Sequence, residues 1–222
     1  ALFLAGKLAR NEWPATAPQR VEAGEYAADL LLAMREDWRG AWAASRALAA
    51  NPDRSPEGRA RDRLRQSALQ VMLIEQNRPH APSFAELRAQ LRKIQEDLPK
   101  EATEEESKIA LLYLKTFAWE GEWGRVEDLA RAFVSQYRNQ TCRRAMARIF
   151  LARSLERTKE YEEALGYLEK VLNTEIPEEE QLRSGMELFD PRALARSEFQ
   201  RFKALQAGAK PAASGDRKMS KK

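Results

Sequence analysis

The chain has 222 residues, of which 43% are hydrophobic and 32% are charged, a composition typical of a soluble protein with a core. This length allows one extended domain or two small ones. No stretch approaches eighteen uninterrupted apolar residues, which excludes a transmembrane helix in the sequence. The net charge of +4 comes from the last thirteen residues, where five basic residues stand against one acidic residue, so the rest of the chain is balanced.

Single cysteine and histidine residues limit the chemistry that the chain can carry. Cys142 has no partner for an intramolecular disulfide or a cysteine metal cluster, and we interpret it as a small semi-buried side chain. His80 lies in a loop with no catalytic companion at a suitable spacing. The opening residues, ALFLAG, are too short for a signal peptide and lack its charged leader. We therefore expect a cytoplasmic protein, and the alternative is an export signal that has been removed.

Apolar residues recur at helical spacing, and no segment alternates with period two over the length of a strand. This pattern predicts an all-α protein. In chain order, we expect helices at residues 1–10, 21–34, 38–50, 60–77, 84–98, 107–120, 123–137, 142–157, 161–172, 178–188 and 191–205. Residues 14–20 form a proline-interrupted linker, residues 53–58 a polar turn, and the chain beyond residue 207 a basic disordered tail.

Two helix starts carry capping signatures. Ser83 followed by Glu86 matches a capping box, and Thr103 followed by Glu106 repeats the same spacing before the helix at residues 107–120. The acidic residues 104–106 complement the dipole at a helix N-terminus, which we favour over a metal or substrate role.

Four helices share one stripe of side chains, which begins with an aromatic residue after a turn and continues at steps of three, four and three residues. The stripes are Trp38, Ala41, Ser45 and Leu48; Phe84, Leu87, Leu91 and Ile94; Trp123, Val126, Ala130 and Phe133; and Tyr161, Ala164, Leu168 and Val171. Because a helical hairpin does not bury its apolar face alone, such repeated hairpins are expected to stack on their neighbours. The sequence therefore predicts an α-solenoid of about four hairpins plus terminal capping helices.

The repeat resembles the tetratricopeptide repeat (TPR) family. The second helix opens with an aromatic residue, a small residue follows three positions on, and Pro177 closes the last unit. Leu151, Ala152 and Leu155 match the first-helix pattern of that family. The resemblance covers residues 21–177 and implies a repeat domain there, preceded by a helix and linker at residues 1–20. Capping helices at residues 178–206 and a basic tail at residues 207–222 complete the organisation.

The chain also departs from the family pattern. The first-helix tryptophan is absent, and the family glycine is replaced by Ala152 and Leu114 in the last two units. The leading aromatic residues lie 46, 39 and 38 residues apart, against a TPR period of about 34 and a HEAT-like period of about 40 to 47. We interpret the units as divergent TPR-like hairpins, with a HEAT-like assignment as the alternative.

The resemblance implies a concave groove lined by the first helix of each hairpin, in which a peptide or partner domain lies. The predicted groove residues are Tyr26, Leu30, Met34, Leu69, Met72, Lys108, Leu111, Lys115, Trp119, Ile149, Arg153 and Arg157. Arg153 and Arg157 lie four residues apart, close enough to bind one acidic group together. A neighbouring basic group comprises Arg138, Arg143, Arg144 and Arg148. The alternative for these arginines is a solvated helix face.

No motif of enzyme chemistry is present: the sequence has no glycine-rich phosphate loop, no His-Glu-x-x-His metal pair and no nucleophile elbow. We therefore expect a non-enzymatic adaptor that binds a protein or peptide partner with an acidic segment, without a cofactor, metal or small-molecule substrate. The alternative is an accessory protein that contacts nucleic acid or an anionic surface. It would use the basic tail, the arginines at residues 59–65 and those at residues 143–157.

Overall fold

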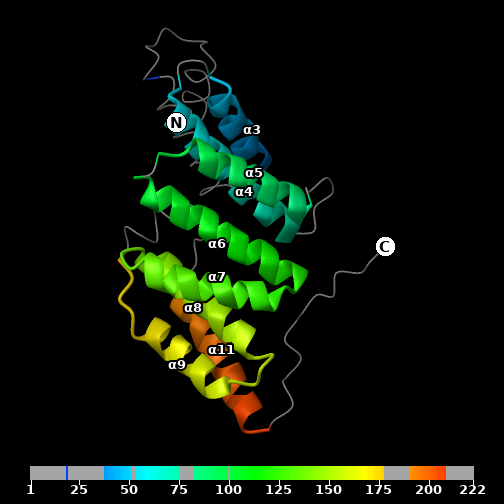
Figure 1. Ribbon diagram of the computed structural model, residues 1–222, viewed down its shortest axis with the longest axis vertical. Helices are drawn as coiled ribbons and strands as arrows, with labels where there is room; N and C mark the ends of the chain where they lie inside the picture. Colours follow the sequence, from blue (N-terminus) through cyan, green and yellow to red (C-terminus); the bar gives the residue numbers. More distant parts are fainter. Residues whose placement is uncertain are drawn as a thin grey trace. The chain divides into compact units, whose positions relative to one another are not determined.

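The computed structural model describes residues 19, 38–51, 54–75, 83–99, 101–177 and 191–208 (Figure 1). Within these ranges the chain is all-helical, with eight helices and no strand. None of these helices is long and apolar enough to cross a membrane. The expected helices at residues 1–10, 21–34 and 178–188, and the tail from residue 209, lie outside the described residues. The chain divides into two compact units, Ala1–Ile109 and Ala110–Lys222, and the boundary falls within helix α6 (Thr103–Glu120).

The N-terminal unit is built around α4 (Pro56–Glu75), which packs against α3 (Trp38–Ala49) and α5 (Phe84–Asp97). The spacing of apolar residues explains this packing, because one face of each helix is buried. Most residues that the stripes and the periodicity placed inside are buried where their side chains are described: Ser45, Leu48, Leu64, Ala68, Val71, Ile74, Leu87, Leu91 and Ile94. Phe84, the leading aromatic residue of the second stripe, is half-buried.

The expected capping box at the start of α5 is confirmed. The backbone N–H of Glu86 donates to Ser83 Oγ at 3.2 Å, and the backbone N–H of Ser83 donates to Glu86 Oε2 at 2.9 Å. These bonds satisfy two N–H groups that the first helical turn leaves without partners. The N–H and hydroxyl of Ser83 also hold the pKa of Glu86 below its ordinary value.

Two other helix starts differ from the sequence-based expectation. Helix α4 begins at Pro56, not Ala60, because proline fits the first helical position and Ser55 Oγ accepts from the N–H of Gly58 at 3.0 Å. Helix α6 (Thr103–Glu120) includes Thr103 instead of starting after it. The Thr103 hydroxyl donates backwards to the Glu101 carbonyl at 3.3 Å, so the expected capping box with Glu106 was wrong.

The C-terminal unit contains the end of α6 followed by α7 (Trp123–Gln136), α8 (Thr141–Leu155), α9 (Tyr161–Leu172) and α11 (Pro191–Gln206). Each of the helices from α7 onward packs against the next described helix, and α11 also reaches α8 (Figure 1). The stripe positions are buried: Val126, Ala130 and Phe133 in α7, and Ala164, Leu168 and Val171 in α9. Helix α8 is buried on most of its circumference and forms the centre of this unit.

Two successive turns of the C-terminal unit share one geometry. Gly121 before α7 has φ 77° and Lys159 before α9 has φ 61°, so both adopt the left-handed conformation. The next residue, Glu122 or Glu160, donates its N–H to the carbonyl five residues back, at 3.0 Å and 3.1 Å respectively. The backbone angles of these two residues are also nearly equal, at φ −80°, ψ 58° and φ −79°, ψ 56°. The two turns are therefore structural equivalents 38 residues apart.

Candidate functional site

The predicted groove residues at the end of α6 divide between surface and core. Trp119, in the last turn of the helix, is 44% exposed. Leu111, two turns earlier, is 7% exposed and belongs to the apolar core of the C-terminal unit. Lys115 is half-buried. Trp119 and Leu129 are the large apolar side chains that remain exposed in the described part of the chain.

Helix α8 separates the predicted residues in the same way. Ile149 is buried in the core. Arg153 donates to Glu198 of α11 through Nη2 at 2.7 Å and Nε at 3.1 Å. Arg157 lies exposed in the turn after the helix and has no bonding partner among the described residues. In this structure, Arg153 and Arg157 thus face different surroundings despite their spacing of four residues.

The acidic group that meets Arg153 belongs to the chain itself. Glu198 is 8% exposed and also accepts from Arg201 Nε at 2.8 Å. Arg201 in turn donates from both terminal nitrogens to the two carboxylate oxygens of Glu156, each at 2.8 Å. Burial lowers the pKa of Arg201, but its bonds to Glu156 and Glu198 leave that pKa above the ordinary value. This ladder of alternating charges fastens α11 to the C-terminal end of α8.

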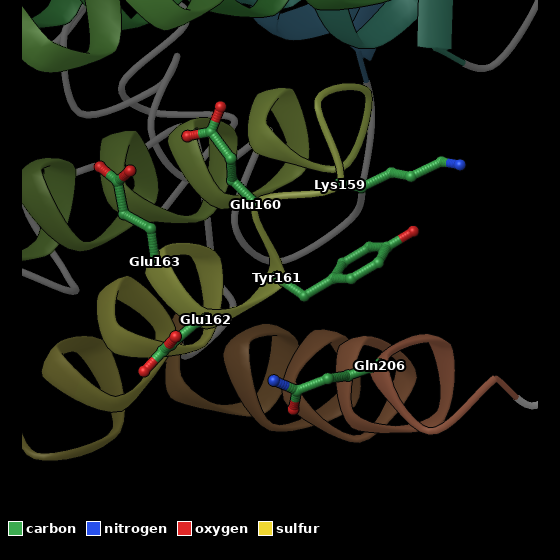
Figure 2. Close-up of a pocket in the computed structure, with 6 residues that line it drawn as sticks. All are labelled: Lys159, Glu160, Tyr161, Glu162, Glu163 and Gln206. Atoms are coloured by element: carbon green, nitrogen blue, oxygen red, sulfur yellow. The ribbon is translucent and has the colours of Figure 1, made fainter.

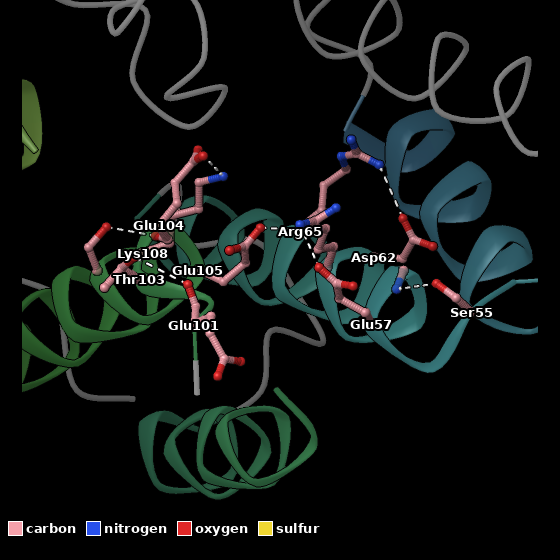
Figure 3. Close-up of polar contacts among 12 residues, drawn as sticks. Ser55, Glu57, Asp62, Arg65, Glu101, Thr103, Glu104, Glu105 and Lys108 are labelled. Atoms are coloured by element: carbon pink, nitrogen blue, oxygen red, sulfur yellow. Dashed lines mark hydrogen bonds and ion pairs between the residues drawn. The ribbon is translucent and has the colours of Figure 1, made fainter. Parts of the chain in front are cut away.

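In the N-terminal unit, the predicted groove residues whose side chains are described are buried or ion-paired. Leu69 is buried, and Lys108 forms an ion pair with Glu104 at 2.9 Å, one turn earlier on α6 (Figure 3). Tyr26, Leu30, Met34 and the side chain of Met72 lie outside the described residues.

The arginine cluster at residues 59–65, a candidate anion-binding surface in the sequence, is occupied by contacts inside the N-terminal unit. Asp62 is fully buried and accepts from Arg65 at 3.4 Å and from Arg54 at 2.8 Å (Figure 3). Arg61 bonds to Glu57 and Glu105, Arg63 bonds to Asp97, and Arg59 donates to the carbonyl of Arg54. These arginines therefore serve mainly to join α4 to neighbouring segments of its own unit.

A hollow of about 420 Å³ lies in the C-terminal unit and is lined largely by basic side chains. Its lining residues, which define the basic hollow, are Arg131, Val134, Ser135, Arg138, Arg144, Leu151 and Tyr167. They come from α7 and its C-terminal turn, from α8 and from α9. The sequence grouped Arg138 and Arg144 but missed Arg131 and Tyr167, because only the packing of three helices brings them to one place.

One cation of the basic hollow is neutralised by the protein. Arg131 bonds to Glu127, one turn earlier on α7, and to Glu163 of α9, both at 3.0 Å. Its Nη1 also donates to the Tyr167 hydroxyl at 3.3 Å. The bond to Glu163, aided by Glu127, raises the pKa of Arg131 above its ordinary value. The spacing of four residues between Glu127 and Arg131 could have predicted their ion pair from the sequence, but not the bond between Arg131 and Glu163.

The other cations at the basic hollow have no acidic partner in the described part of the chain. Arg144 donates to the Arg138 carbonyl at 3.5 Å, and Arg148, one turn further along α8, donates to Thr174 Oγ1 at 3.4 Å. The buried Nε atoms of both side chains lack an acceptor there. Arg138 itself bonds only to the Ser135 carbonyl, at 3.3 Å. Burial, followed by the charge of Arg144, lowers the pKa of Arg148 from its ordinary value.

A second hollow lies where the turn after α8, the first turn of α9 and the end of α11 meet (Figure 2). Its lining is mainly acidic and comprises Lys159, Glu160, Tyr161, Glu162, Glu163 and Gln206. Figure 2 shows Tyr161 of α9 and Gln206 of α11 on facing sides of this hollow. Among the described residues, no group of histidine, cysteine, aspartate and glutamate side chains is arranged to hold a metal ion.

Cys142 lies near the start of α8 and is fully enclosed, at 3% exposure. His80 lies outside the described residues.

Comparison with known proteins gives no match to a protein-family model, a curated protein or a solved structure.

Proposed function

We propose that this protein is a non-enzymatic scaffold for protein–protein interaction, built from TPR-like helical hairpins that stack in chain order. The observation that carries the proposal is the equivalence of the turns at Gly121 and Lys159, which precede Trp123 and Tyr161 with matching backbone angles and hydrogen bonds. In the stripes that follow both turns, the leading aromatic residue is half-buried and the other three residues are buried, which supports a repeated unit. Stacked units of this kind present extended surfaces to partners.

The residues of the C-terminal unit that best suit a partner are Trp119 and Arg157, both of which are exposed. A tryptophan that is 44% exposed stands out, because the neighbouring aromatic residues Phe117 and Trp123 are half-buried. Tryptophan and arginine are also the residue types that most often dominate the binding energy of interfaces. Arg157 has no bonding partner in the described ranges and is therefore available to an acidic group.

The bond between Arg153 and Glu198 determines how this proposal should be tested. Substitution of Arg153 would remove one of the two arginine partners of the buried Glu198 carboxylate and would weaken the fold together with any binding. Trp119 and Arg157 are exposed, so their removal should change binding with little effect on stability.

The experiment compares Trp119→Ala/Arg157→Gln with the matched control Leu129→Ala/Arg196→Gln in the full chain. The control removes the other large exposed apolar side chain and an exposed arginine that has no bonding partner in the described residues. Partners are captured from native extract by crosslinking and quantified. We expect the first variant to lose at least about 90% of the recovered partner, a loss equivalent to roughly 1.4 kcal/mol, while the control retains it. Equal recovery by both variants, with helicity intact, would refute the proposed surface.

A further inference from the structure

Two arginines of the basic hollow, Arg138 and Arg144, form an unbalanced group of charges with Arg148, one turn further along α8. Arg138, Arg144 and Arg148 bond only to neutral oxygen atoms within the described chain. Like charges held together and partly removed from water are unfavourable unless an opposite charge or strong acceptors compensate them. A buried polar group without a partner in a folded protein often marks the place of a bound ion or ligand. The cluster is therefore matched to an anion that the described residues do not supply.

The nearby acidic groups do not cancel this charge. The carboxylates of Glu127 and Glu163 are both bonded to Arg131, a lining residue of the hollow. A further cation, Lys170, lies with its Nζ 5.2 Å from the centre of the Tyr167 ring.

The uncharged lining of the hollow indicates which anion fits. Val134, Leu151 and the ring of Tyr167 provide apolar surface beside the guanidinium groups. A volume of about 420 Å³ accommodates one or two side chains. A carboxylate with an apolar neighbour, as in an acidic peptide, would satisfy both kinds of surface at once.

A nucleic acid fits this site less well. Single-stranded nucleic acids bind through aromatic side chains whose faces are free to stack on bases. Tyr167 is the aromatic residue of the hollow, and its ring and hydroxyl are already engaged by Lys170 and Arg131.

We infer that the basic hollow is a binding site for an acidic peptide segment, with a glutamate or aspartate carboxylate held by Arg144 and Arg138 and an apolar neighbour against Val134. Arg148 strengthens the positive potential from behind Arg144. This inference rests on the proposed function, because it names the chemical class of the partner, but it places that contact on residues other than Trp119 and Arg157.

The test uses a fluorescein-labelled peptide of alternating leucine and glutamate pairs, with a matched peptide that carries glutamine in place of glutamate. Binding to the full chain is measured by fluorescence anisotropy at low ionic strength. We expect Arg144→Gln/Arg148→Gln to weaken binding of the acidic peptide at least about tenfold, since each charge-assisted bond contributes on that scale. The control Arg92→Gln/Arg196→Gln removes two exposed arginines without bonding partners in the described residues and should change binding less than about twofold.

A second measurement does not depend on the folding of the variant. Titration of the acidic peptide into the wild-type chain should shift the side-chain Nε–H NMR signals of Arg144 and Arg148, and leave those of Arg92 and Arg196 in place. Inorganic phosphate and a single-stranded oligonucleotide serve as competitors.

The outcomes separate this inference from the proposed function. Equal affinity for the glutamate and glutamine peptides, equal weakening by the two double variants, or tight binding of only phosphate or only the oligonucleotide would overturn the acidic-peptide site. None of these results alters the comparison of Trp119→Ala/Arg157→Gln with its control. Conversely, a failed partner capture would leave selective peptide binding at Arg144 and Arg148 intact.

Discussion

The two ends of α8 carry arginines in opposite situations. Near the C-terminal end, Arg153 meets Glu198 of α11 at 2.7 Å. Toward the N-terminal end, Arg144 and, at the middle of the helix, Arg148 donate only to a carbonyl and a hydroxyl of the described residues, at 3.5 Å and 3.4 Å. The residue type and the helix are the same, so the acidic residues of neighbouring helices decide the role. Arg153 joins α8 to α11 through an ion pair, whereas Arg144 and Arg148 have no acidic partner among the described residues, which is the basis for the proposed peptide site.

The largest expected effect on the free energy of unfolding comes from removal of the Glu198 charge, which pairs with Arg153 near the C-terminal end of α8. Glu198→Gln keeps the shape of the side chain but leaves the charge of Arg153 without its partner. We expect a loss of about 1–3 kcal/mol in the free energy of unfolding, less than for a fully buried pair because Arg153 is 31% exposed. Urea denaturation followed by circular dichroism measures this loss.

Glu162→Gln is the matched control for this change. Glu162 is exposed on α9 and has no bonding partner in the described part of the chain, so its substitution should cost less than about 0.5 kcal/mol. If Glu198→Gln were as mild as this control, the pairing at the C-terminal end of α8 would not contribute to the fold.

Local features of the structure could be predicted from the sequence. The stripe of Trp123, Val126, Ala130 and Phe133 depends on spacing within one helix, and its last three members are buried. The bonds between Ser83 and Glu86 join residues three positions apart, so the sequence alone supplied both partners. The all-helical class of the described residues follows from the same short-range periodicity.

The features that could not be predicted depend on contacts between distant residues or on competing local bonds. Glu198 lies 45 residues from Arg153, and no spacing rule connects them. The basic hollow needs α7, α8 and α9 together. At the start of α6, the Thr103 hydroxyl donates to the Glu101 carbonyl, and the N–H of Glu106 donates to the Ala102 carbonyl and not to Thr103. Leu69 and Ile149 were placed at a groove by helix position, and their burial depends on neighbouring helices that the sequence did not specify.

The turn that follows the C-terminal end of α8 allows a second test, in which Lys159 is compared with Gly121 in the equivalent turn before α7. Lys159 holds φ 61°, a conformation that disfavours side chains, whereas its structural equivalent is Gly121. We expect Lys159→Gly to raise the free energy of unfolding by about 0.5–1 kcal/mol, because relief of this strain exceeds the added entropy of the unfolded chain.

The reciprocal change is Gly121→Lys. A Cβ at Gly121 would meet no atom within 4 Å, so the cost there is conformational and should be about 1 kcal/mol in the opposite direction. Thermal unfolding of both variants measures the pair. If both substitutions changed the free energy of unfolding in the same direction, the two turns would not be equivalent. That result would also contradict the repeat on which the proposed scaffold depends.

The smallest expected effect on stability comes from substitution of Arg148, which has no acidic partner among the described residues, and it compares Arg148 directly with the paired Arg153. Because burial and the charge of Arg144 lower the pKa of Arg148, the protonated side chain is less favourable in the folded chain than in the unfolded chain. Arg148→Met keeps a long flexible stem and removes the charge, so the free energy of unfolding should stay level or rise by up to about 1 kcal/mol, the gain being limited by solvent screening. Arg153→Met, five residues further along the helix, should lower it, because Glu198 would lose a partner. Urea denaturation at low and high salt measures both variants. If both variants lowered the free energy of unfolding by a similar amount, Arg148 would stabilise the fold as Arg153 does. The charge of Arg148 would then be compensated within the folded chain and would not favour a bound anion.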